Sequence, residues 1–119
     1  MATTWLIYQG QTGAVRTGRL SDANGYVDLS DFDSVRVIAQ KTKSSEPVID
    51  ELVTIAPNQV TNKGLFSFTF SAPNAAIEVN AQGYLLFFKC LDGTDPTYFP
   101  LNRHSERTYG RLIVQRPLG

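Results

Sequence analysis

Three phenylalanines spaced two residues apart constrain the fold of this chain more than any other feature. Phe66, Phe68 and Phe70 alternate with leucine, serine and threonine within residues 64–70. Because successive side chains of a β-strand point to opposite faces, the three rings share one face. We therefore predict a strand over 64–70 whose aromatic face lines the core of the protein.

A second alternating segment, residues 34–40, supplies a candidate partner for that face. Val35 and Val37 lie on one side of the predicted strand, and only Ile38 breaks the alternation. A strand with one apolar face is typical of a half-buried sheet. We expect an opposing sheet that presents Val35, Val37 and Leu112 to the phenylalanines.

Turn signals recur about every 8–12 residues, a spacing typical of a sandwich or a barrel. Asn24-Gly25 favours a hairpin tip over 20–27, because both residues tolerate positive φ angles. Residues 74–79, after Ser71-Ala-Pro73, are the one helical candidate, of one or two turns. We predict a single domain, 1–119, with seven to nine strands, at 4–9, 14–20, 34–40, 48–55, 64–70, 83–90, 97–101 and 109–115.

Composition supports an all-β domain and excludes several classes of function. Val, Ile and Thr outnumber Ala, Glu and Lys, and 11% of the residues are aromatic. Eleven basic residues balance eleven acidic ones, so the electrostatic footprint of a nucleic-acid or anionic-membrane binder is missing. The N-terminus lacks the features of a secretory signal, and the longest apolar run is far below the ~18 residues of a membrane span. We expect no partnership with nucleic acid or membrane.

Candidate catalytic and metal-binding residues are few. His104, the single histidine, lies in a polar stretch, and one imidazole without a second ligand at metal spacing makes a poor zinc site. Cys90 excludes an intrachain disulfide and is expected to act as a small buried hydrophobe. We therefore predict that the chain is not an enzyme and that it binds no metal and no cofactor. Aspartates could form turns or bind calcium, and the turn-forming role is preferred, at Asp28, Asp31, Asp33, Asp92 and Asp95.

Charge is distributed unevenly along the chain. Arg103, Arg107, Arg111 and Arg116 cluster near the C-terminus, whereas residues 20–52 hold seven acids against three bases. One interpretation is simply solvated strand faces. The other is electrostatic complementarity between subunits, in which the basic end of one copy meets the acidic end of another.

The predicted strand 83–90 is apolar on both faces. Leu85 and Phe87 lie on the face opposite to Tyr84, Leu86, Phe88 and Cys90, whereas the outward face of a two-layer sandwich is normally polar. Either residues 74–79 or a terminal arm cover this face, or another protein chain does. We favour the second explanation and predict a subunit interface built from Leu85, Phe87, Lys89, Arg103, Arg107 and Arg111.

The ordered signals resemble the immunoglobulin-like domain at the N-terminus of bacteriophage baseplate upper proteins and related small tail proteins. The matching residues are Gln9-Gly10-Gln-Thr-Gly13, Gly18-x-Leu20-x-Asp22-x-x-Gly25, Val27-Asp28-Leu29-Ser30 leading to Val35-x-Val37, Gly64-x-Phe66-x-Phe68, Gly83-Tyr84, Asp92-Gly93, Phe99-Pro100 and Leu112-x-Val114. The resemblance implies an antiparallel immunoglobulin-like sandwich and no catalytic residue. In that family the domain begins a longer chain, whereas this sequence ends at Gly119, as a stand-alone adaptor would. Tyr84 also resembles the tyrosine corner of immunoglobulin sandwiches.

This resemblance implies a structural virion protein, most simply a tail or baseplate component that attaches to other virion proteins and to copies of itself. It would act in the phage particle and pass through the host cytoplasm during assembly. A head decoration or fibre-base protein is a related alternative. A small carbohydrate-binding sandwich is a different one, which would need exposed aromatic rings grouped on one face, from Trp5, Tyr8, Tyr98 or Tyr109.

Overall fold

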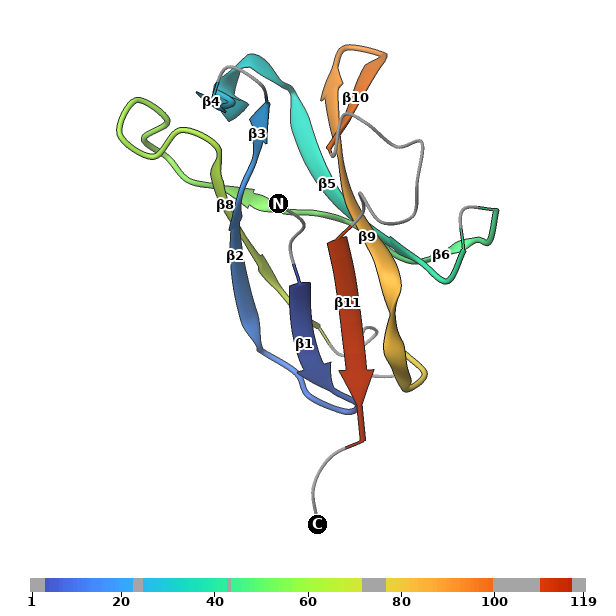
Figure 1. The fold of residues 1–119 in the computed structure, drawn as a ribbon. Coiled ribbons are helices and arrows are strands. Elements are labelled where there is room, and N and C mark those ends of the chain that lie inside the picture. Colours follow the sequence, from blue (N-terminus) through green and yellow to red (C-terminus); the bar gives the residue numbers. More distant parts are fainter. Residues whose placement is uncertain (1–3, 23–24, 43, 72–76, 100–109, 117–119) are drawn as a thin grey trace.

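The computed structural model describes residues 4–22, 25–42, 44–71, 77–99 and 110–116, and nearly all of its regular structure is β (Figure 1). Three of its eleven strands have only two residues, which leaves eight longer ones, within the predicted seven to nine. The strands are β1 (Thr4–Tyr8), β2 (Val15–Arg19), β3 (Ser21–Asp22), β4 (Gly25–Tyr26), β5 (Ser34–Gln40), β6 (Pro47–Leu52), β7 (Thr54–Ile55), β8 (Leu65–Thr69), β9 (Asn80–Asp92), β10 (Asp95–Phe99) and β11 (Gly110–Gln115).

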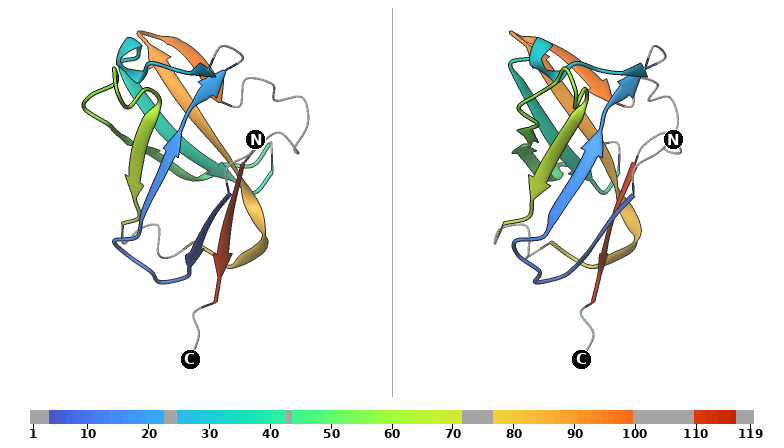
Figure 2. Two further views of the ribbon diagram at one scale, coloured as in Figure 1. Left: turned by 60° about the vertical axis from the view of Figure 1, so that its left-hand side comes forward. Right: turned by 90° about the vertical axis from the view of Figure 1, so that its left-hand side faces the viewer.

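Two sheets form the sandwich. Sheet A has the order β1-β11-β9-β5-β6, with β10 paired to β9, and sheet B has the order β2-β8-β7. Figure 2 shows β2 and β8 facing the layer that contains β5 and β9. In an immunoglobulin-like sandwich the second, fifth and fourth strands oppose a sheet built on the third, sixth and last strands, and the variable type adds a strand beside the third. Sheets B and A follow this order, which confirms the predicted all-β immunoglobulin-like sandwich.

The first strand departs from the otherwise antiparallel pairing. β1 runs parallel to β11, from Thr4 opposite Arg111 to Tyr8 opposite Gln115. After β1 the chain turns through Gly10 and Gly13, both at positive φ, and enters the other sheet as β2. The first two strands therefore belong to different sheets, and β1 pairs with the last strand instead of forming a hairpin with its successor.

The core lies between the two sheets, as the alternating segments predicted. Phe66, Phe68 and Phe70 from the sheet B side share one buried cluster with Val35, Val37 and Leu112 of sheet A. Trp5 of β1 is packed among the rings: its ring is stacked on that of Phe68 at 6.3 Å and meets that of Phe88 edge-on at 5.8 Å. Gly18 of β2 leaves room for this packing, because a Cβ there would lie 2.6 Å from the Phe66 ring.

One predicted strand, 48–55, is divided between the two sheets. β6 pairs with β5 in sheet A, whereas β7 pairs with β8 in sheet B. The chain crosses at Val53, which is half-buried against the core and donates its N–H to the Val35 carbonyl at 3.0 Å. The sequence did not reveal this crossing, because Val53 is itself an apolar residue packed against the core and no turn residue marks the change of sheet.

The helix predicted at 74–79 is absent from the part of that segment that the structure describes. Residues 77–79 are not helical, and 74–76 lie outside the described residues. The helical turn that the structure contains is a 3₁₀ turn at Leu29–Asp31, begun by Asp28, whose Oδ1 accepts from the Ser30 N–H at 3.0 Å. Two other strands shift in extent: β9 is longer than the predicted 83–90, and β10 begins and ends two residues before the predicted 97–101.

The tyrosine corner is present at the start of β9. The Tyr84 hydroxyl donates to the Glu78 carbonyl, six residues upstream, at 2.8 Å. This bond ties the segment before β9 to the strand, as in other immunoglobulin sandwiches. Gly83, at a φ of +94°, lies within β9 where the register with β11 shifts, and its N–H donates to the Asn80 Oδ1 at 3.0 Å.

Candidate functional site

Leu85 and Phe87 of β9, the apolar centre of the predicted subunit interface, are buried inside the chain. Their exposed fractions are only 3% and 7%. With Ile38 of β5 they form a small second cluster on the outer face of sheet A, and Tyr98 of β10 packs against it. The Phe87 and Tyr98 ring centroids are 6.1 Å apart. The expectation of an exposed apolar pair here was wrong, because the protein itself covers both side chains.

The charged members of the predicted interface divide into two groups. Lys89 is half-buried at the rim of this outer cluster, with its Nζ 6.0 Å from the centroid of the Tyr98 ring. Arg111 of β11 is also half-buried, and its Nη1 is buried without a hydrogen-bond partner in the described part of the chain. Arg103 and Arg107, together with His104, lie outside the described residues. Of the basic cluster near the C-terminus, the structure places the half-buried Arg111 and the exposed Arg116.

Cys90 is fully buried in the core, as expected of a small hydrophobe. Burial raises the pKa of its thiol from an ordinary value of 9.0 to about 12. A thiol that keeps its proton and is shielded from solvent is a poor nucleophile.

Two of the candidate aspartates, Asp28 and Asp33, accept hydrogen bonds that hold turns. The Asp28 carboxylate accepts from the Ser30 hydroxyl at 2.6 Å and from the Ser30 N–H, and these bonds lower the pKa of Asp28. The Asp33 carboxylate accepts from the Gly93 N–H at 2.6 Å and so holds the β9–β10 turn against the start of β5. Within the described ranges no group of three potential metal ligands comes together.

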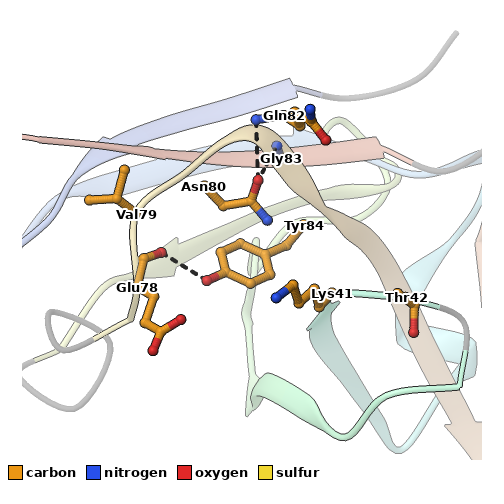
Figure 3. Close-up of a pocket in the computed structure, with 8 residues that line it drawn as sticks. All are labelled: Lys41, Thr42, Glu78, Val79, Asn80, Gln82, Gly83 and Tyr84. Carbon is orange, nitrogen blue, oxygen red and sulfur yellow. Dashed lines mark hydrogen bonds between the residues drawn. The ribbon is translucent and has the colours of Figure 1, made fainter.

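A polar pocket of about 370 Å³ lies beside the tyrosine corner (Figure 3). Figure 3 shows the Lys41 ammonium and the Glu78 carboxylate at the sides of the Tyr84 ring. The pocket is lined by Lys41, Thr42, Glu78, Val79, Asn80, Gln82, Gly83 and Tyr84.

Two polar side chains of this pocket, those of Asn80 and Tyr84, make hydrogen bonds that support the fold. The Asn80 Oδ1 accepts from the N–H groups of Gln82 and Gly83, and the Tyr84 hydroxyl donates to the Glu78 carbonyl. Burial and the nearby Glu78 raise the pKa of Tyr84, so its hydroxyl remains protonated as a donor. The lining of the pocket includes the Lys41 ammonium and the Glu78 carboxylate.

An arginine side chain contacts each of the two end strands of sheet A. At one end the Arg16 guanidinium of β2 donates to the Leu6 carbonyl of β1 at 2.6 Å and to the Val15 carbonyl at 3.0 Å. Arg16 therefore joins the edge of sheet A to the edge of sheet B. At the other end Arg36 of β5 donates to the Asp50 carboxylate at 2.7 Å and to the Asp50 carbonyl at 2.8 Å.

The edge strand β6 was not recognised as a candidate surface from the sequence. Its side chains alternate, with Val48, Asp50 and Leu52 exposed and Ile49 buried. Val48 and Leu52 are 41% and 59% exposed. The signal that could have revealed it was this alternation of apolar and acidic residues on one face, obscured because 48–55 was interpreted as one strand.

The aromatic platform required for the carbohydrate-binding alternative is not assembled. Trp5 is buried in the core, Tyr8 is exposed on β1, and Tyr98 is half-buried against Phe87. Tyr109 lies outside the described residues. The described rings therefore do not share one exposed face.

No protein-family model matches the chain, and no curated protein matches its sequence. In the described part of the structure, no helix has the length and apolar character needed to cross a membrane.

Proposed function

We propose that this chain is a structural protein of a bacteriophage particle, a tail or baseplate component that attaches to other virion proteins and to copies of itself. The observation that carries the proposal is that the fold of the chain agrees with the fold that the sequence resemblance implies. The residues of the resemblance run from Gln9 to Val114, and the sandwich is of the immunoglobulin-like type that the resemblance implies.

The glycines of that pattern occupy positions where the backbone requires them. Six of them have positive φ angles, which only glycine adopts readily, and the seventh, Gly18, faces the Phe66 ring at close range. The glycines of the pattern therefore meet backbone requirements of this sandwich, which supports the proposal.

An attachment role is also supported by where the exposed apolar residues lie. Leu6 and Tyr8 are exposed on β1, at one end of sheet A, and Val48 and Leu52 are exposed on β6, at the other. Exposed apolar groups on sheet edges favour contact with other proteins. The polar pocket, whose groups hold the tyrosine corner together, supports a structural role for that region.

The experiment that tests this proposal is mass spectrometry of purified phage particles from the source of the protein, followed by gold labelling with an antibody against it. We expect the chain to copurify with particles and the label to lie at the tail or baseplate. Label on the head would favour the decoration alternative. Absence from intact particles, with the protein left in the soluble lysate, would refute the virion role.

A further inference from the structure

The pocket beside the tyrosine corner lies where the pairing of β5 with β9 ends. The last paired residues are Gln40 and Leu85. Beyond them the chain continues through Lys41 and Thr42, and the pocket lies between these residues and the start of β9 (Figure 3). Its volume of about 370 Å³ falls within the range of small-molecule sites, roughly 300–1,000 Å³. The pocket is therefore large enough for a small ligand.

Hydrogen bonds fix the backbone on both sides of this pocket. On one side the Glu78 carbonyl accepts from the Tyr84 hydroxyl at 2.8 Å. The preceding residue, Ile77, is buried in the core, and its carbonyl accepts from the Gln9 side chain at 3.2 Å. On the other side the Thr42 N–H donates to a serine hydroxyl three residues on, at 2.8 Å. Because the walls are already ordered, a ligand would not have to order them on binding.

Asn80 contributes a hydrogen-bond donor whose direction is fixed. Its Oδ1 accepts from the N–H groups of Gln82 and Gly83, at 3.1 and 3.0 Å, and these two bonds determine which way the amide group is turned. Figure 3 shows the Asn80 Nδ2 turned away from both N–H groups and towards Tyr84. Among the residues that the structure describes, Nδ2 has no hydrogen-bond partner. The pocket therefore holds a positioned donor that the fold does not use.

The two charged residues of the lining, Lys41 and Glu78, restrict the class of ligand. Both are exposed, and no ion pair joins these two residues, both of which the structure describes. An anion attracted by Lys41 would be repelled by Glu78, and a cation attracted by Glu78 would be repelled by Lys41. A neutral ligand would displace water from both charges and compensate neither. A compound that carries both a negative and a positive charge satisfies both residues.

We propose that this pocket binds a small zwitterion with the chemistry of a free amino acid. The carboxylate of the ligand accepts from the Lys41 ammonium and from the Asn80 Nδ2, and its ammonium donates to the Glu78 carboxylate. In the view of Figure 3 the two nitrogen atoms lie near one end of the Tyr84 ring and the carboxylate near the other. Hydrogen bonds between charged groups are stronger than neutral ones. The site goes beyond the proposed attachment role and does not depend on it.

NMR titration of the protein with simple zwitterions tests the proposal. Glycine, β-alanine and 4-aminobutyrate are the probes, because the distance between their two charges increases in that order. Acetate and methylammonium are the matched ligands with one charge each. We expect at least one zwitterion to shift the signals of the Asn80 side-chain amide and of the Gln82 and Gly83 N–H groups. Its Kd should be at least tenfold lower than the Kd of acetate or of methylammonium.

Three substitutions test the assigned contacts. Lys41→Gln and Glu78→Gln each remove one charge, so each should raise the Kd of that zwitterion about tenfold or more. Asn80→Asp keeps an oxygen for the two backbone N–H groups but replaces the Nδ2 donor with a second oxygen, so it should also weaken binding. Lys63→Gln and Glu46→Gln, at exposed residues outside the pocket lining, are the matched controls and should leave the Kd unchanged. Circular dichroism verifies that every variant is folded.

Titrations in which none of the three zwitterions shifts the pocket signals would overturn the proposal. It would also be overturned if acetate or methylammonium bound as tightly as every zwitterion, or if Lys41→Gln and Glu78→Gln left the Kd unchanged. The result is independent of the particle experiment. A zwitterion bound in this pocket by a protein absent from virions supports the site and refutes the virion role, and a virion protein whose pocket binds none of the probes does the opposite.

Discussion

Phe68 lies at the point where the rings of the two sheets meet. Its ring is stacked on Trp5 and meets Phe70 edge-on, with centroids 5.0 Å apart. Phe68→Ala removes a buried ring and leaves a cavity, so the free energy of unfolding should fall by ~3–5 kcal/mol. Urea unfolding of both proteins measures this difference. A loss below about 1 kcal/mol would mean that the ring is not buried as described.

Ionisation of Cys90 should lower the free energy of unfolding at alkaline pH. Its folded pKa of about 12 lies above the ordinary 9.0, so the unfolded state loses the thiol proton first. The stabilising contribution is complete below pH 9 and is lost as the pH rises towards 12. Between these limits the free energy of unfolding should therefore fall less in Cys90→Ala than in the natural protein. Parallel declines would show that Cys90 ionises equally easily in both states.

At the scale of elements, the outer cluster on β9 and β5 explains three irregularities of the sequence together. Ile38 breaks the alternation of β5, and Leu85 and Phe87 make the outer face of β9 apolar; all three pack on one another. Each was visible locally as an apolar residue on a predicted outer face. Their mutual contact was not visible, because it depends on the pairing of β5 with β9 across almost fifty residues of chain.

This cluster predicts that Leu85→Ser combined with Phe87→Ser destabilises the isolated chain. Both side chains are buried, so the double change should cost more than about 3 kcal/mol in the free energy of unfolding. Leu52→Ser, on an exposed residue of β6, is the control and should have little effect. A double variant that is as stable as the natural protein would restore the earlier interpretation of an exposed interface.

Arg16 holds two elements of different sheets together. Arg16→Ala removes hydrogen bonds to the Leu6 and Val15 carbonyls, so it should lower the free energy of unfolding by about 1 kcal/mol or slightly more. It should also speed amide exchange in β1 more than in β9. Equal acceleration in both strands would mean that Arg16 supports the fold as a whole and not the seam between β1 and β2.

The positions of the strands were largely predictable from the sequence. Which strands pair with each other, and in which sheet, was not. β5 and β8 followed from period-two alternation, which is a local property of the sequence. The parallel pairing of β1 with β11 and the change of sheet at Val53 depend on which strands meet in space. The turn at Leu29–Asp31 had a local signal, the capping side chain of Asp28, which the sequence interpretation assigned only to turn formation.

At the scale of the whole molecule, the sandwich closes most of its own apolar surface. The outer face of β9 is covered within the chain, and Arg16 joins one pair of edges. In the described part of the chain, β6, with exposed Val48 and Leu52, and β10 each pair with one neighbour only. A protein built in this way is suited to assemble by extending a sheet at its edge and not by stacking sheet faces. The balance of charges, eleven basic and eleven acidic residues, does not oppose association of identical copies.

Assembly through the edge strand, and not through a sheet face, is tested most directly by amide hydrogen exchange measured in dilute and in concentrated solution. The amides of Asp50 and Leu52, which point away from β5 in the register of this pair, should exchange more slowly when the protein is concentrated, because they then bond to a second copy. Amides of β9, already paired on both sides with β5 and β11, should be unchanged. Slower exchange confined to residues outside β6, or none anywhere, would contradict assembly through this edge.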